Sequence, residues 1–158
     1  MKLKSIPNLL YNKTHLNLSP PIYIGIGLKK GVSQTTITTG IEELLITYNL
    51  ENHQIGTIAT IDHKASEVGL LSFCQLHNLP LKTFTSAQLK NVIVPHPKTN
   101  INELIGTPSV AEAAAILAAS EINNIDKFNI ELIVPKQIFN LPETKEMITL
   151  AIAIRSIN

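Results

Sequence analysis

Four ionisable side chains gather where an apolar segment gives way to a helical pattern. Asp62, His63, Lys64 and Glu67 follow the run Ile58-Ala59-Thr60-Ile61, which is typical of a buried strand. A buried strand has no need of charges, whereas the carboxyl edge of an open α/β sheet is where ligands bind. At such an edge Lys64 could pair with a ligand carboxylate, and Asp62 or Glu67 could act as a general acid or base.

The same residues also have a local structural explanation. Glu67 could stabilise the N-terminus of the helix that follows, and Asp62 could cap a turn. His63 alone indicates little, because exposed loop histidines are common. Polar residues concentrated on strand-end loops often form sites, so we take Asp62 and Glu67 as catalytic candidates and Lys64 as a ligand-binding candidate.

A second candidate loop follows the first apolar run, residues 22–27. Residues 25–31 have the spacing GxGxxxG, one residue longer than the dinucleotide-binding fingerprint, and no Gly-Lys-Ser/Thr phosphate loop follows. Nucleotide binding stays an alternative, but a tight turn and close backbone approach explain these glycines better. Lys29 and Lys30 in this loop face whatever ligand binds there.

Two further segments extend this set of candidates into a basic rim. Residues 106–109 precede a helix, so their free backbone N–H groups and hydroxyls form an anion-binding arrangement, although helix capping alone would also explain them. Lys136 directly follows a predicted strand over 130–134. Such a rim suits a ligand that bears carboxylates or phosphates. The ligand-binding candidates are Gly27, Lys29, Lys30, Lys64, Thr107, Ser109 and Lys136.

The periodicity of the chain predicts the elements that position these residues. Strands are expected over 22–27, 54–61, 81–84, 130–134 and 147–154, and helices over 33–48, 66–76 and 86–91 and from Ser109 onward. The expected fold is α/β, with a mixed, mostly parallel sheet, helices on both faces and an antiparallel edge hairpin. Residues 20–158 would form one domain, preceded by an N-terminal extension or linker over 1–19.

Two helices have predicted packing faces. The expected apolar stripe of the second helix comprises Leu70, Leu71, Cys74 and Leu76. In the last helix, six alanines between 111 and 119 make a slim element that can pack closely on a sheet. Ser109 and Glu112 have the spacing of a capping box at the start of that helix.

Composition excludes several classes of function. The chain has 158 residues, a formal net charge of +1, 4% aromatic residues and no Trp, which disfavours nucleic-acid binding. Its single cysteine, Cys74, cannot form an intramolecular disulfide, which fits a cytoplasmic protein. No apolar run reaches the roughly 20 residues that span a membrane, and the histidines lack metal-ligand spacing. We therefore expect no membrane segment, no metal site and no cofactor.

Taken in order, these loops resemble the C-terminal domain of the cobalamin biosynthesis protein CbiG and its stand-alone relative CobE. The resemblance spans residues 22 to 154. Its matching stretches are Gly25-Ile26-Gly27 with Lys29-Lys30-Gly31, Ala59-Thr60-Ile61-Asp62 with Lys64, Glu67 and Gly69-Leu70, residues 106–114, and Val134-Pro135-Lys136.

The resemblance implies a role in corrin-ring assembly. Full-length relatives are cobalt-precorrin-5A hydrolases, which open a δ-lactone and release acetaldehyde, and stand-alone relatives belong to the aerobic route. The implied ligand is a carboxylate-rich precorrin, which a lysine rim suits. We expect an accessory or carrier module that works with other cobalamin-pathway enzymes, with a hydrolase component, in which Asp62 or Glu67 activates water, as the alternative.

Two departures from the family pattern bear on that alternative. Many relatives have Cys-Arg where this chain has Leu28-Lys29, so a cysteine nucleophile is excluded there. Residues 1–19 cannot replace the N-terminal portion of the full-length hydrolases, so we expect lactone hydrolysis to need more than this chain.

Overall fold

The computed structural model describes residues 20–92, 109–120 and 129–156. The strands are β1 (Ile22–Leu28), β2 (Ile55–Ile61), β3 (Leu81–Phe84), β4 (Asn129–Leu141) and β5 (Glu146–Ser156). The helices are α2 (Gln34–Thr47), α3 (Val68–Leu76), α4 (Ser86–Lys90) and α6 (Val110–Ser120), with short 3-10 turns η1 (Asn52–Gln54) and η2 (Asp62–Lys64). The predicted extension over residues 1–19 lies outside the described part of the chain.

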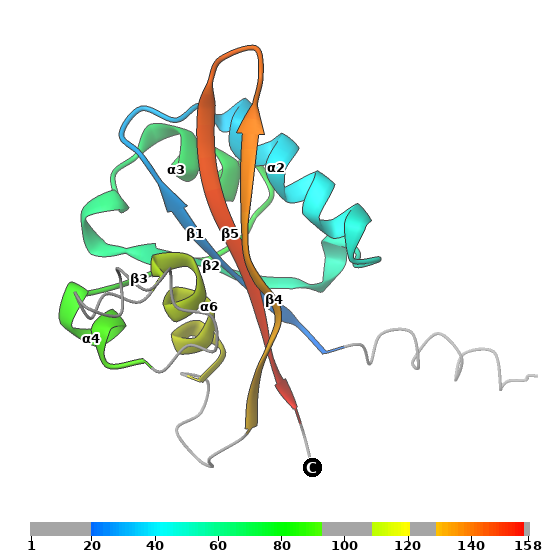
Figure 1. The fold of residues 1–158 in the computed structure, drawn as a ribbon, viewed down its shortest axis with the longest axis vertical. Helices are drawn as coiled ribbons and strands as arrows, with labels where there is room; N and C mark the ends of the chain where they lie inside the picture. Colours follow the sequence, from blue (N-terminus) through cyan, green and yellow to red (C-terminus); the bar gives the residue numbers. More distant parts are fainter. Residues whose placement is uncertain (1–19, 93–108, 121–128, 157–158) are drawn as a thin grey trace, which may run out of the picture.

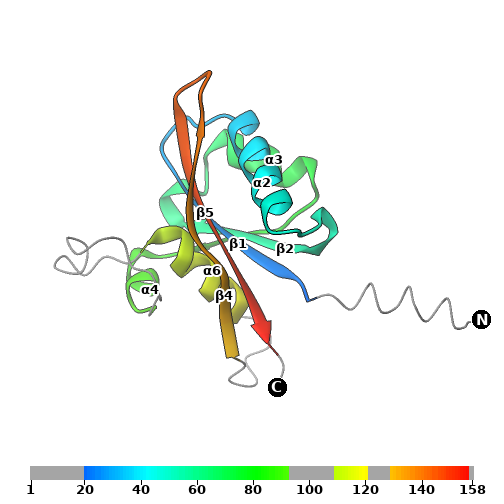
Figure 2. The same cartoon turned by 45° about the vertical axis from the view of Figure 1, so that its right-hand side comes forward.

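Within the described residues, five strands form one sheet in the order β3-β2-β1-β5-β4. Strands β1, β2 and β3 run parallel, whereas β5 is antiparallel to both β1 and β4. Helices α6 and α4 lie on one side of the sheet and α2 and α3 on the other (Figures 1 and 2). The predicted mixed α/β fold, with helices on both faces and an antiparallel edge hairpin, is confirmed.

Alternation along the central strand β1 divides the core into two layers. Ile22, Ile24 and Ile26 face α2 and α3 and belong to a cluster of large aliphatic side chains. Tyr23 faces α6 and belongs to a second cluster, rich in alanine. Because a strand points successive side chains to opposite faces, alternate residues of β1 contribute to the two layers of the core.

The alanine layer lets α6 approach the sheet very closely. A Cβ atom added at Gly25 of β1 would lie 1.9 Å from the carbonyl oxygen of Ala111. Both Gly25 and Ala111 are buried. The predicted slim helix is therefore observed, and it needs a glycine on the strand beneath it.

Two sequence predictions about these elements are wrong. In α3, Leu71 and Leu76 are 44% and 68% exposed, whereas Phe73 is buried. The helical stripe runs through residues 70, 73 and 74, a spacing that positions 71 and 76 do not share.

The second correction concerns β4, which does not end at Val134 but continues to Leu141. Its pairing with β5 shifts register between Val134 and Gln137, so Pro135 sits in a bulge of an edge strand. Edge strands and bulges tolerate a proline, which cannot donate to the ladder. Lys136 therefore lies within a strand rather than directly after one.

Candidate functional site

The two loops that follow β1 and β2 are tied together by Glu67. Its Oε1 accepts a hydrogen bond of 2.9 Å from the backbone N–H of Gly31. The helix predicted over 66–76 begins at Val68, and Glu67 occupies the capping position without a side-chain cap bond. The carboxylate therefore fixes one loop to the other rather than its own helix.

A cleft of about 490 Å³ opens between these two loops, a volume typical of small-molecule sites. Lys30 and Glu67 give it charge, and Val68, which is 75% exposed, gives it an apolar wall. Its lining comprises Lys30, Gly31, Val32, Ser33, Gln34, Ser66, Glu67, Val68 and Gly69. The cleft can accept a ligand with an apolar body and an anionic substituent.

A second cleft, of about 390 Å³, lies on the other side of the β1–α2 loop. Lys29, Lys30 and Lys145 line it, the last from the turn between β4 and β5. We did not single out Lys145, because its separation from Lys29 along the chain hides their proximity. The pairing of β5 with β1 brings the hairpin tip to this loop.

The hairpin tip is attached to the start of α2 through Glu146. Its Oε1 accepts hydrogen bonds from the Ser33 N–H at 3.1 Å, the Ser33 hydroxyl at 2.9 Å and the Thr36 hydroxyl. The Thr36 hydroxyl first, and then the two Ser33 donors, hold the pKa of Glu146 below its ordinary value of 4.5. The N-terminus of α2 thus already binds a carboxylate of the same chain.

We expect Glu146→Gln to lower the melting temperature by a few degrees at neutral pH. Because folding lowers the pKa of Glu146, its charge stabilises the fold above pH 4.5 and loses that effect as pH falls through the lowered folded value. Melting curves from about pH 7 to about pH 3 should show the difference from wild type shrinking. Glu143→Gln, an exposed change in the same turn, is the control. If the melting-temperature difference between Glu146→Gln and wild type stayed constant with pH, the charge of Glu146 would not be what attaches the hairpin tip to α2.

The start of α6 brings together Ser109, Glu112 and Lys136. The Ser109 Oγ accepts a 3.4 Å bond from the Glu112 N–H, which is one arm of the predicted capping box. The Glu112 carboxylate extends to β4 instead, where its Oε2 accepts a 2.9 Å bond from the Lys136 N–H. Ser109 is only 5% exposed, and Thr107 lies outside the described residues.

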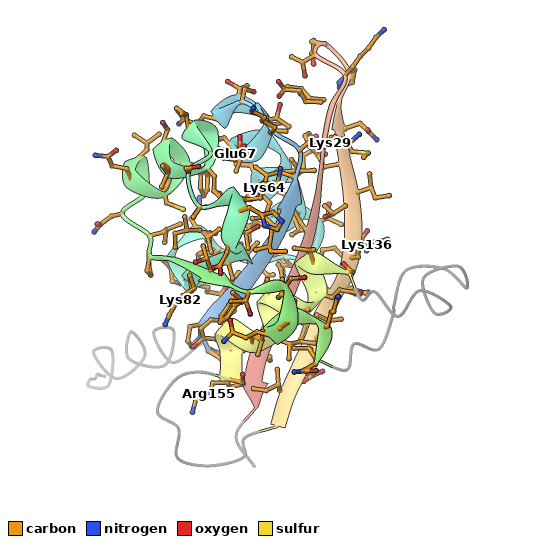
Figure 3. All side chains as sticks on the ribbon, turned by 90° about the vertical axis from the view of Figure 1, so that its left-hand side faces the viewer. Lys29, Lys64, Glu67, Lys82, Lys136 and Arg155 are labelled. Carbon is orange, nitrogen blue, oxygen red and sulfur yellow. The ribbon has the colours of Figure 1, made fainter. Side chains whose placement is uncertain are left out.

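Figure 3 shows how the candidates are distributed. Lys29, Lys64 and Glu67 lie in the upper part of that view, and Lys136 lies below them beside the start of α6. Gly27 lies near the end of β1, where its carbonyl accepts a 3.5 Å bond from the Thr149 hydroxyl. A Cβ at Gly27 would lie 4.0 Å from the Val110 Cβ of α6.

The remaining acidic candidate, Asp62, is exposed at the start of η2, as is His63 beside it. Neither lines the two clefts described above. Within the described ranges, no three His, Cys, Asp or Glu side chains gather to hold a metal ion. None of the helices in those ranges is long and apolar enough to cross a membrane.

Cys74 lies in the hydrophobic core, and burial raises the pKa of its thiol to about 11. We expect the folded protein to react with Ellman's reagent at about pH 8 about a hundredfold more slowly than the denatured chain, because little thiolate is present. Comparing labelling rates with and without guanidinium chloride measures this. Equal rates would mean that Cys74 is accessible.

A family model described as cobalamin synthesis G C-terminus matches residues 22–153, nearly all of the described fold. The chain belongs to this family. It is thus a cobalamin biosynthesis protein of the CbiG and CobE type, as its ordered loops predicted.

Individual relatives agree with the family. Over 118 residues the chain is 26% identical to a probable cobalt-precorrin-5A hydrolase of Methanocaldococcus jannaschii. That alignment covers 73% of this chain but only 36% of the relative, so the chain spans about a third of that protein's length.

Two solved structures share the fold over nearly their whole length. CobE, from the cobalamin biosynthetic pathway, has a TM-score of 0.72 at 23% identity, covering 89% of this chain and 97% of its own. The cobalamin biosynthesis protein chiG of Agrobacterium tumefaciens has a TM-score of 0.61 at 25% identity, covering 86% and 99%. The CobE likeness establishes the fold of the domain.

Proposed function

We propose that this chain binds a carboxylate-rich precorrin-type tetrapyrrole as an accessory or carrier module of the cobalamin pathway. The observation that carries the proposal is the placement of Lys29, Lys30 and Lys145 around clefts at one edge of the sheet. Lys64 in η2 and Lys136 in β4, both labelled in Figure 3, are the further members that we propose for this basic rim. A ligand with an apolar macrocycle and peripheral carboxylates matches the apolar wall and the lysines.

The lysines are available to such a ligand. In the part of the chain that the structure describes, Lys29, Lys30 and Lys145 form no ion pair. The nearby carboxylates are already engaged by uncharged donors: Glu67 by the Gly31 N–H, and Glu146 by the start of α2. Both acids keep their negative charge, but neither holds any of these three described lysines in an ion pair, so the three ammonium groups remain available to donate hydrogen bonds to a ligand.

A hydrolase component is the second candidate, favoured by the likeness to the M. jannaschii protein. In that case Asp62 is the carboxylate better able to activate water, because it is exposed whereas Glu67 is bonded to Gly31. The matched region is 36% of that relative, so we propose that further residues of another domain or partner enzyme complete the reaction.

The nucleotide-binding alternative has little support. A nucleotide phosphate in such folds sits at the N-terminus of the helix after the first strand. Here the donors of that terminus, from Ser33 and Thr36, bind the Glu146 carboxylate.

Two assays on the same protein separate these functions. For a binding module, the visible spectrum of a polycarboxylated cobalt corrin should change on titration, and no acetaldehyde should form from the lactone intermediate. Acetaldehyde release that Asp62→Asn abolishes would establish the hydrolase alternative instead. Thermal stabilisation by nucleotides, with no effect of the corrin, would overturn both.

A further inference from the structure

Glu112 is the buried carboxylate that the proposed ligand rim leaves unexplained. Its exposure is 0%, and it lies in the first turn of α6, against the sheet. Its Oε2 accepts the Lys136 N–H, while its Oε1 has no hydrogen-bond partner among the described residues. A half-satisfied buried carboxylate is costly, so its retention needs a reason.

The reason lies in the β4 bulge. Pro135 and Lys136 together oppose the single β5 residue Ala151, since the register passes from Val134–Ile152 to Gln137–Leu150. Pro135 has no N–H to donate, and the Lys136 N–H leaves the ladder and is taken by Glu112.

The carbonyl groups of the bulge are also satisfied by a side chain. The Gln137 Nε2 donates to the Pro135 carbonyl at 3.0 Å and to the Lys136 carbonyl at 3.1 Å. Glu112 thus binds an N–H group of the bulge, and Gln137 binds two of its carbonyl groups. One use of a bulge is to re-aim a side chain, and Lys136 is the charged residue at this bulge.

We propose that Glu112 is a positioning residue, which fixes the Lys136 bulge to the start of α6 so that the Lys136 ammonium group meets a ligand carboxylate. The anchoring of the bulge stands on the geometry alone, whereas the contact with a ligand carboxylate rests on the proposed function. The anchor requires a hydrogen-bond acceptor at position 112 but no charge. Glutamine should therefore replace Glu112, and methionine, of similar size without a strong acceptor, should not.

The first experiment measures hydrogen exchange at the Lys136 amide by NMR, without ligand. In Glu112→Met we expect this amide to exchange about tenfold faster than in wild type, because its hydrogen bond to the Glu112 side chain is lost. Glu112→Gln should keep the amide protected, and amides of β1 should be unchanged in both variants. Protection that survives in Glu112→Met would overturn the anchor, as would its loss in both variants.

The second experiment uses cobyrinic acid, a corrin whose side chains are free carboxylates, as the probe. Lys136→Ala should weaken its binding by about threefold to tenfold, and Glu112→Met by a similar factor. The double variant should bind no more weakly than Lys136→Ala alone, because Glu112 acts through that lysine. If the double variant lost affinity by the product of the two single losses, the positioning role would be overturned. If the wild-type protein did not bind cobyrinic acid, the proposed function would be wrong, and the hydrogen-exchange experiment alone would decide whether Glu112 anchors the bulge.

Discussion

Replacing Gly25 by alanine should destabilise the protein by about 3 kcal/mol, the upper part of the range for an overpacked core. The new Cβ would lie 1.9 Å from the Ala111 carbonyl oxygen and 2.8 Å from the Ala115 nitrogen. Both contacts are to backbone, so no side chain can rotate away and α6 itself must move. Denaturant unfolding of wild type and variant measures the change through the midpoint at constant slope.

Gly31→Ala is the matched control for this prediction. Gly31 has φ +86° and no atom within 4 Å of an added Cβ, so alanine meets backbone strain there without a clash. We expect a cost of about 1 kcal/mol. Both variants replace glycine by alanine, so the change in the entropy of the unfolded chain is the same in the two. The difference between their unfolding free energies therefore reports the clash at Gly25 against the strain at Gly31. Equal destabilisation of the two would show that α6 does not rest on β1 as described.

Reversing charge at Lys29 and Lys30 together should weaken binding of a polycarboxylated corrin by at least about tenfold at low salt. Each exposed lysine–carboxylate pair contributes up to about 1 kcal/mol, and reversal replaces attraction by repulsion. The loss should shrink as salt is raised, because the Debye length falls to about 8 Å at physiological ionic strength. Absorbance titrations of the Lys29→Glu/Lys30→Glu variant at two salt concentrations measure both effects.

A single pair of variants tests whether position, rather than total charge, matters. Lys30 lines both clefts, whereas Lys82 lies on β3, away from Lys29 and Lys64 in Figure 3. The substitutions Lys30→Glu and Lys82→Glu change the net charge by the same amount. Lys30→Glu should reduce affinity and Lys82→Glu should leave it nearly unchanged. Similar losses from the two would mean that only the overall charge attracts the ligand.

Much of the fold could be predicted because local signals and packing agree. The helix predicted over 33–48 is observed as α2, which Ser33 caps, and the apolar stripe of α2, formed by Ile37, Ile41, Leu44 and Leu45, is buried. The stripe of α3 was misjudged because that segment is apolar at adjacent positions, and only packing against α2 and β1 selects the buried ones. Periodicity cannot choose a face where most residues are apolar.

The site was predictable only in part. Strand-end position pointed to Lys29, Lys30 and Lys64, because parallel strands share a carboxyl edge. Lys145 and Glu146 escaped notice because their relation to this edge depends on β5 lying beside β1, which spacing along the chain does not reveal. The spacing of Glu112 predicted a capping box, but the β4 bulge gave its carboxylate a different partner.

A titration with two corrins tests whether this edge of the sheet recognises the carboxylates of a corrin. Wild-type protein is titrated into cobyrinic acid and, separately, into cobinamide, whose side chains are amides, while the visible spectrum is followed. We predict a spectral change that saturates below about 100 μM protein with cobyrinic acid, and binding at least about tenfold weaker with cobinamide. An unchanged spectrum with cobyrinic acid, or equal binding of the two corrins, would show that this edge does not recognise corrin carboxylates.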